Sequence, residues 1–298
     1  MKNIKNHNGW IKSLLAFFLL FVPQILGAVI LLIAGYDLSK MSSGKIDLNT
    51  MIILEYSMIF FMVILLWLFM KFIDKQPFIQ IGLQTKGRLK EFNYGIFLGF
   101  IIMGAAFLFL FSINEIVFVD FSFNLNKVLL SIVLFTGVSV FEEVVFRGYM
   151  LKNLLESFNP YLALFISSIF FSLIHGYNPN VTTLGLCNIF LAGFLLGASY
   201  VFTKNLWFPI ALHFSWNFFQ SMFGFKVSGL DSYSIIEFTI PENNMLNGGE
   251  FGFESSYLSI IILILGIFII WNYFKNNSLI EKVNGSLTQL VQSVTLTG

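Results

Sequence analysis

Apolar stretches of about 20 residues recur along the whole chain, and they restrict its fold more than any other feature. A helix needs roughly 20 apolar residues to cross the ~30 Å hydrocarbon core of a bilayer. We count eight such stretches, at 13–35, 51–73, 94–113, 128–146, 160–175, 183–203, 206–224 and 256–274. The chain is 57% hydrophobic and only 11% charged, which excludes an ordinary soluble domain. The sequence therefore predicts an all-α polytopic membrane protein with about eight transmembrane helices.

The chain reads as one helical domain without internal repeats. We predict an N-terminal tail over 1–12, a transmembrane domain over 13–274 and a C-terminal tail over 275–298. The first apolar stretch is too long for the core of a signal peptide, so we expect a retained helix. The single cysteine, Cys187, rules out an intrachain disulfide. A net charge of +1 argues against nucleic acid as a partner.

Positive charge is distributed unevenly between the two sides that eight spans define. With the N-terminus inside, all but four of the 17 Lys and Arg residues lie in cytoplasmic segments. The four exceptions are Lys40, Lys45, Lys127 and Lys226. Lys and Arg are enriched in short cytoplasmic loops of membrane proteins. We therefore predict that both termini are cytoplasmic and that the polar insert 228–256 lies outside.

The stretch FEEVVFRGYM, at 141–150, places two adjacent carboxylates in an apolar run. A charge at bilayer depth costs about 2.5–3.5 kcal/mol, so an acid there indicates function. Neighbours on a helix are turned ~100° apart, whereas residues four apart share a face. Glu143 is therefore predicted to pair with Arg147, in the favourable acid-first order. This leaves Glu142 free to meet a partner from another helix.

Two of the three histidines also lie in apolar runs. His175 ends the fifth stretch, one turn after Phe171, and His213 lies in the seventh with Asn217 on the same face. Glu142 and His175 are about equally far from the turn between their helices, so antiparallel packing brings them together. A carboxylate, two imidazoles and an amide supply the groups for water activation and oxyanion stabilisation. These residues predict amide hydrolysis inside a membrane.

Small residues on two neighbouring stretches predict close helix packing. Gly193 and Gly197 form a small-xxx-small pattern, and Ser168 and Ser172 repeat it on the preceding helix. Such patterns let helix backbones approach closely in lipid. We expect them to bring the helices with the polar residues together.

Three motifs resemble those of the CAAX-processing and bacteriocin-processing (CPBP, or Abi) family of intramembrane endopeptidases. They are Glu142, Glu143 and Arg147; Phe171 and His175; and His213 and Asn217. The resemblance extends over roughly 78–270 and includes the stretch GGEFGFE before the last helix. The three motifs occur in the family's order and on apolar segments.

This resemblance implies an eight-helix bundle around a polar intramembrane cavity and a protease activity. It implies Glu142 as the general base and His175 as its partner on the water. It implies His213 and Asn217 as the pair that binds the oxyanion. The residues implied to support them are Glu143, Arg147 and Phe171.

The substrate class follows from the resemblance and from residue usage. The chain is rich in Lys, Asn, Ile and Phe, with 38 Phe residues, which is typical of a bacterium of low genomic GC content. Such a bacterium has no prenylated CAAX proteins. We expect a protein of the bacterial plasma membrane that cleaves a membrane-associated peptide or protein, in peptide maturation or bacteriocin self-immunity. The oligomeric state stays open.

A zinc site and two other functions remain as alternatives. Glu142, His175 and His213 could bind zinc with water in the fourth position. The chain lacks an H-E-x-x-H helix, however, and ligation by Glu142 would leave only Glu143 as base. We therefore favour a mechanism without a cofactor. A non-catalytic immunity or scaffold protein, and a proton-coupled transporter with a Glu–His relay, are the other possible functions.

Overall fold

A computed structural model of the chain describes residues 8–36 and 46–295, with side chains as far as residue 277. The α-helices are α1 (Gly9–Leu19), α2 (Phe21–Ile33), α3 (Leu48–Leu68), α4 (Leu89–Ser112), α5 (Leu125–Glu143), α6 (Lys152–Ser157), α7 (Pro160–Ile174), α8 (Thr183–Thr203), α9 (Trp207–Met222) and α10 (Tyr257–Thr295). The π-helical segments are η2 (Phe69–Asp74) and η4 (Val144–Leu151), and the 3-10 segments are η3 (Phe78–Ile81), η5 (His175–Tyr177), η6 (Gly249–Phe251) and η7 (Phe253–Ser255). The strands are β1 (Val117–Phe121) and β2 (Ile236–Thr239).

In the part of the chain that the structure describes, seven helical segments are long and apolar enough to cross a membrane. They are Gly9–Ile33, Leu48–Asp74, Leu89–Ser112, Leu125–Ser157, Pro160–Tyr177, Thr183–Thr203 and Tyr257–Asn277. The prediction of an all-α polytopic membrane protein is confirmed. The stretch predicted at 206–224 forms α9, which has 16 residues, most of them buried, and is shorter than these segments.

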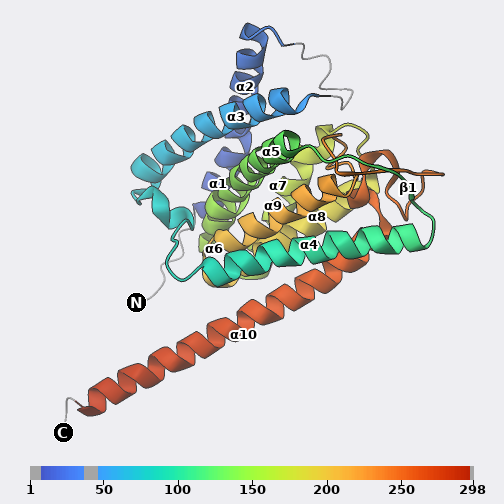
Figure 1. The fold of residues 1–298 in the computed structure, drawn as a ribbon. Coiled ribbons are helices and arrows are strands. Elements are labelled where there is room, and N and C mark those ends of the chain that lie inside the picture. Colours follow the sequence, from blue (N-terminus) through green and yellow to red (C-terminus); the bar gives the residue numbers. More distant parts are fainter. Residues whose placement is uncertain (1–7, 37–45, 296–298) are drawn as a thin grey trace.

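Several boundaries differ from the sequence prediction because a helix can continue through polar residues beyond its apolar stretch. The first helix begins at Gly9, inside the tail predicted over 1–12. At the other end, α10 continues as helix to Thr295, through most of the tail predicted over 275–298, and projects beyond the bundle (Figure 1). The fourth span is longer than the predicted 128–146, since α5, η4 and α6 form one helical segment.

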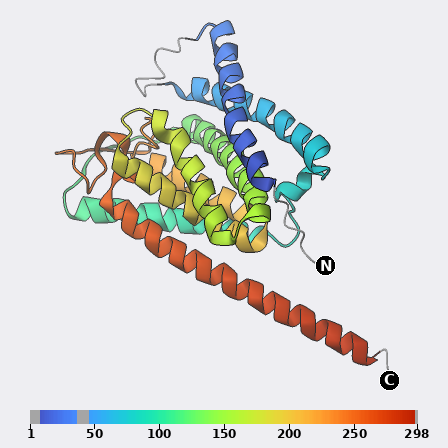
Figure 2. The ribbon, with the colours of Figure 1, turned by 180° about the vertical axis from the view of Figure 1, so that it is seen from behind.

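The helices that carry the three motifs lie together at the centre of the bundle. Helix α5 packs against α3 and α9, α7 packs against α8, and α9 lies along α4. Figures 1 and 2 show the α2–α3 hairpin on one side of this group and α4 with α10 on the other. The polar motif residues are thereby enclosed by helices from both ends of the chain.

A small antiparallel sheet closes one end of the bundle, and the apolar pattern did not predict it. Strand β1, between α4 and α5, pairs with β2 in the polar insert, with Val117 opposite Thr239 and Phe121 opposite Ile236. The register shifts between Phe118 and Asp120. Because β1 leads into α5, this strand pairing holds the polar insert predicted at 228–256 near the start of α5.

Helices α7 and α8 approach closely at the predicted small residues. A Cβ atom added to Gly193 would lie 2.8 Å from both Cβ and Oγ of Ser168. Real Cβ contacts are longer than this, so only glycine fits at position 193 without movement of α7. Because His175 directly follows α7, this contact also positions the end of the helix that carries the histidine.

Gly193→Ala is expected to destabilise the protein by about 1–3 kcal/mol, because overpacking at a close contact forces a shift of the neighbouring helix. Thermal unfolding of the purified protein in detergent measures the effect. Gly104→Ala in α4 is the matched control, since its new Cβ would lie 3.9 Å from the nearest atoms. Alanine gains up to ~1 kcal/mol of helix propensity at either site, so the difference between the variants isolates the clash. Equal melting temperatures would contradict the close packing.

Candidate active site

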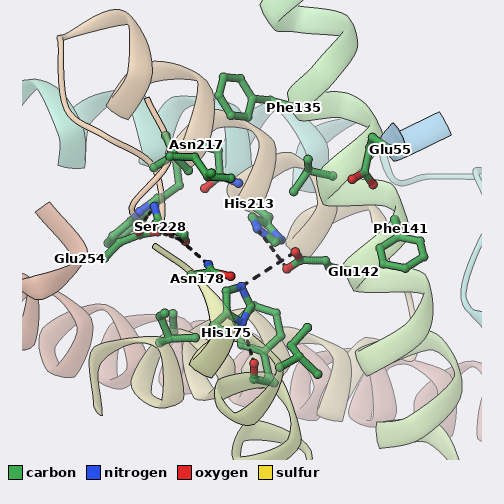
Figure 3. A pocket seen from close by; sticks show the side chains of 18 of the residues that line it. Glu55, Phe135, Phe141, Glu142, His175, Asn178, His213, Asn217, Ser228 and Glu254 are labelled. Atoms are coloured by element: carbon green, nitrogen blue, oxygen red, sulfur yellow. Dashed lines mark hydrogen bonds and ion pairs between the residues drawn. The ribbon is translucent and has the colours of Figure 1, made fainter. Parts of the chain in front are cut away.

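Three of the predicted site residues converge from three helical segments. Glu142 is the last residue but one of α5, His175 begins η5 and His213 lies in α9. Nε2 of His175 is 3.9 Å from Oε1 of Glu142, and Nε2 of His213 is 3.8 Å from Oε2 of the same carboxyl group. Figure 3 shows both imidazole rings directed at Glu142. The structure therefore places the carboxyl group of Glu142 between the two histidines.

The hydrogen bond of His175 determines which of its ring nitrogens carries the proton. Its Nδ1 is 2.7 Å from the backbone oxygen of Phe171, one turn earlier. A carbonyl oxygen only accepts, so Nδ1 is protonated and donates. In the neutral ring, Nε2 then presents a lone pair to the space beside Glu142.

Glu143 faces away from this space and accepts two hydrogen bonds in a fully buried position. Nη1 of Arg147 donates to its Oε1 at 2.8 Å, which is the predicted ion pair. Nδ1 of His213 is 2.9 Å from the same oxygen. Sequence reasoning missed this second contact, since Glu143 and His213 are 70 residues apart and no spacing rule connects them. Glu143 thus fixes the ring of His213 with Nε2 toward Glu142.

Arg147 packs on the ring of Phe171, which in turn packs against the ring of His175. Arg147 is 1% exposed, donates from Nη2 to the backbone oxygen of Gly193 at 3.2 Å, and lies over the ring of Phe171 with Cζ 4.3 Å from the ring centre. The same ring is 4.9 Å from the ring of His175, centre to centre. The charge of Arg147 is therefore paired inside the protein, as the spacing predicted.

A π-helical segment begins directly after Glu143, where the sequence predicted a regular α-helix. All eight residues of η4 are buried, and Arg147 lies in its first half. π-Helical turns are rare and occur frequently at functional sites. This turn changes the angular spacing along the helix immediately after the two glutamates.

A cavity of about 470 Å³ lies against these residues. Glu142, His175, His213 and Asn217 line it together with many apolar side chains. Asn217 is 5% exposed and lies one turn beyond His213 on α9. All four residues predicted as catalytic therefore share one cavity inside the bundle.

Two further acids line the cavity, and sequence reasoning did not single out either one. Glu55 lies in α3 and Glu254 in η7. Glu55 is an acid within a predicted span, so the rule that drew attention to Glu142 could have found it. Glu254 belongs to the stretch GGEFGFE, which was noted only as part of the family resemblance, and no spacing rule connects it to the motifs.

Glu254 ties the polar insert to the segment that follows His175. Its carboxyl group accepts hydrogen bonds from the backbone N–H and the hydroxyl of Ser228. The backbone oxygen of Ser228 in turn accepts from Nδ2 of Asn178 at 3.1 Å (Figure 3). Burial raises the pKa of the Glu254 carboxyl group, and the bonds from Ser228 partly oppose that shift. The insert thereby contributes one wall of the cavity.

The residues proposed as zinc ligands do not form a metal-binding group in this structure. Across residues 8–36 and 46–295, no group of three or more His, Cys, Asp or Glu residues is arranged to hold a metal ion. The two histidines each bond to an acceptor through Nδ1, an arrangement that also orients histidines in metal sites. The observed bonds thus orient both rings with Nε2 toward Glu142.

A comparison with known protein families finds a match to the segment that contains the site. Residues 124–219 match the family model described as "Type II CAAX prenyl endopeptidase Rce1-like", and this range contains every predicted site residue. Residues 9–44 match a model described as "Mechanosensitive ion channel, conserved TM helix", which covers the first span. No curated protein and no solved structure proved similar to the chain. The matched segment and the three motifs support a CAAX-type intramembrane protease, the family that the sequence resembles.

Proposed function

We propose that the protein is an endopeptidase that hydrolyses a peptide bond of a membrane-associated peptide or protein with water activated by Glu142. One observation carries the proposal. The carboxyl group of Glu142 lies between the Nε2 atoms of two histidines on the wall of a cavity inside the bundle. The position of this cavity within the bundle supports a substrate that enters from the membrane.

The separation of Glu142 and His175 suits a bridging water. Both groups are hydrogen-bond acceptors, and their nearest atoms are 3.9 Å apart, too far for a direct bond. A water between them donates one hydrogen to each and keeps a lone pair for attack on the substrate carbonyl carbon. Glu142 takes the water's proton during the attack and returns it to the leaving amine.

In the proposed mechanism, His213 and Asn217 stabilise the oxyanion. Nδ1 of His213 donates to the Glu143 carboxylate, and a protonated ring then has a second N–H at Nε2. That N–H and the side-chain amide of Asn217 are two donors for the negative oxygen of the tetrahedral intermediate. Each such donor typically contributes about 2.7–4 kcal/mol. In this mechanism Glu143 keeps His213 oriented and charged.

The direct test is to identify cleaved peptides. The purified protein in lipid vesicles is incubated with membrane peptides from a low-GC bacterium, and the products are analysed by mass spectrometry. The wild type should generate fragments that Glu142→Ala does not. The same fragments from both proteins would contradict the proposed activity. Cleaved sequences would also distinguish peptide maturation from bacteriocin self-immunity as the biological role.

We predict that the activity does not depend on a metal, since Glu142 can activate water with His175 alone. Cleavage should persist after treatment with a zinc chelator, and metal analysis of the active protein should give much less than one zinc per chain. The contrary result is stoichiometric zinc, with activity lost on chelation and restored by added zinc. In that case the ligands would be Glu142, His175 and His213.

We also propose that the protein lies in a bacterial plasma membrane with both termini in the cytoplasm. This orientation counts α9 as an eighth crossing besides the seven long apolar segments, and it rests on the excess of Lys and Arg on the cytoplasmic side. Reporter fusions measure the topology. A fusion after the last residue should give a cytoplasmic signal, and one beside Glu242 should give an external signal. A cytoplasmic signal beside Glu242 would refute this orientation.

A further inference from the structure

Glu55 is a buried acid on the wall of the cavity, and the proposed reaction does not use it. Its side chain projects from α3 into the space that also holds Glu142 (Figure 3). The residue is 8% exposed, and its Oε1 is buried without a hydrogen-bond partner among the described residues. A buried polar atom without a partner is costly, and in a native site it calls for an explanation.

The charges that line the cavity indicate what could pair with Glu55. Among the residues that the structure describes, three carboxyl groups line it, those of Glu55, Glu142 and Glu254, and no Lys or Arg does. Glu142 faces two histidines, and Glu254 is held by Ser228. Glu55 has no ion pair within the described part of the chain. The cavity therefore has an acid without a partner in the described part of the chain, and a cation that enters from outside would pair with its ionised form.

The surroundings of Glu55 suit a cation on an aliphatic stem. Met51, Leu54 and Met58 of the same helix line the cavity with it, as do Leu134 and Val138 of α5. Gly137 of α5 lies against Glu55, since a Cβ there would be 3.1 Å from Cγ of Glu55. Lysine and arginine bury apolar stems along such surfaces while their charged ends reach a polar group. A buried carboxylate paired with such a side chain is stable only when both are present.

We propose that Glu55 forms a specificity subsite that binds a lysine or arginine side chain of the substrate in the cavity beside the catalytic carboxyl group. The term substrate rests on the proposed endopeptidase function, whereas the binding of a basic side chain does not. The same negative lining disfavours a segment that carries a carboxylate. The subsite selects internal basic segments over acidic ones and over a C-terminal carboxylate.

Peptide binding tests the subsite. A set of short, apolar, fluorescently labelled peptides carries lysine, norleucine or glutamate at one position, and that position is moved along the peptide. Binding is measured by fluorescence anisotropy to the full chain in detergent, in a Glu142→Gln background that prevents cleavage. At one or more positions, lysine should bind about tenfold or more tightly than norleucine. Glutamate should bind more weakly than norleucine.

Substitutions at Glu55 then assign the preference. Adding Glu55→Gln should abolish the advantage of lysine and leave norleucine binding unchanged, while Glu55→Asp, which keeps the charge, should retain part of it. Glu237→Gln, an equal change of charge at an exposed residue of β2, is the control and should have no effect. Thermal unfolding shows whether each variant is folded. If Glu55→Gln is not, the comparison of lysine with norleucine in the parent protein still decides.

Two outcomes would contradict the proposed subsite. In the first, lysine binds no more tightly than norleucine at any position, whether or not the peptides bind at all. In the second, the advantage of lysine persists in folded Glu55→Gln. The first outcome is also expected if Glu55 stays a neutral, protonated acid when the peptide binds, because a neutral acid forms no ion pair with lysine. Failure of the endopeptidase function is a separate result, in which the wild type cleaves none of the peptides although lysine still binds more tightly through Glu55.

Discussion

Glu142→Gln is expected to fold and insert normally but to cleave about 10²–10⁴-fold more slowly, since that is the usual cost of losing a general base. The loss is larger if the same group also holds the water. Stability should change little, because Oε2 of Glu142 is buried without a hydrogen-bond partner and the nearest histidine nitrogens are 3.8 and 3.9 Å away. Cleavage per folded molecule and the melting temperature in detergent are the two measurements.

The neighbouring residue supplies the matched control. Glu143→Gln removes the same charge one residue away, but it also weakens the bonds from Arg147 and His213. It should therefore lower the melting temperature and leave partial activity in the molecules that fold. If Glu142→Gln cleaved normally while Glu143→Gln was inactive at full stability, the two roles would be reversed.

The sequence predicted the parts of this site that depend on local spacing. Glu143 pairs with Arg147 because residues four apart share a helix face, and the small residues at Gly193 and Ser168 bring α7 and α8 together. Glu142 meets His175 because the two lie at equal depth on either side of one turn. Periodicity and helix rise are sufficient for each of these predictions.

The features that were missed depend on contacts between distant segments or on exceptions to regular geometry. No property of the sequence connects Glu143 to His213, yet their bond orients the ring. The π-helical turn of η4 has no residue signature, since it arises from packing of a fully buried segment. Glu55 differs, because its charge within an apolar stretch was visible in the sequence and gains meaning only from the cavity.

Arg147→Met is expected to cause a larger loss of stability than Gly193→Ala. Glu143 is 0% exposed, and removal of Arg147 would leave its carboxylate buried without its charged partner. Breaking a buried ion pair from one side typically costs about 3–5 kcal/mol. Thermal or denaturant unfolding in detergent measures the change. Lys226→Met is the control, since Lys226 and Glu250 are 2.6 Å apart with 32% and 61% of their side chains exposed, and such pairs contribute about 0–1 kcal/mol.

The double variant Glu143→Gln/Arg147→Met separates the cost of the unpaired charge from the loss of packing on Phe171. With both charges removed, no unpaired ion remains, so the double variant should be more stable than Arg147→Met alone. Its activity per folded molecule should be reduced to about that of Glu143→Gln, because neutral Gln at position 143 no longer stabilises a protonated His213. If the double variant were no more stable than Arg147→Met, the loss of stability would come from the contact of Arg147 with Phe171. If its activity per folded molecule equalled that of the wild type, Glu143 would have no role in orienting or charging His213.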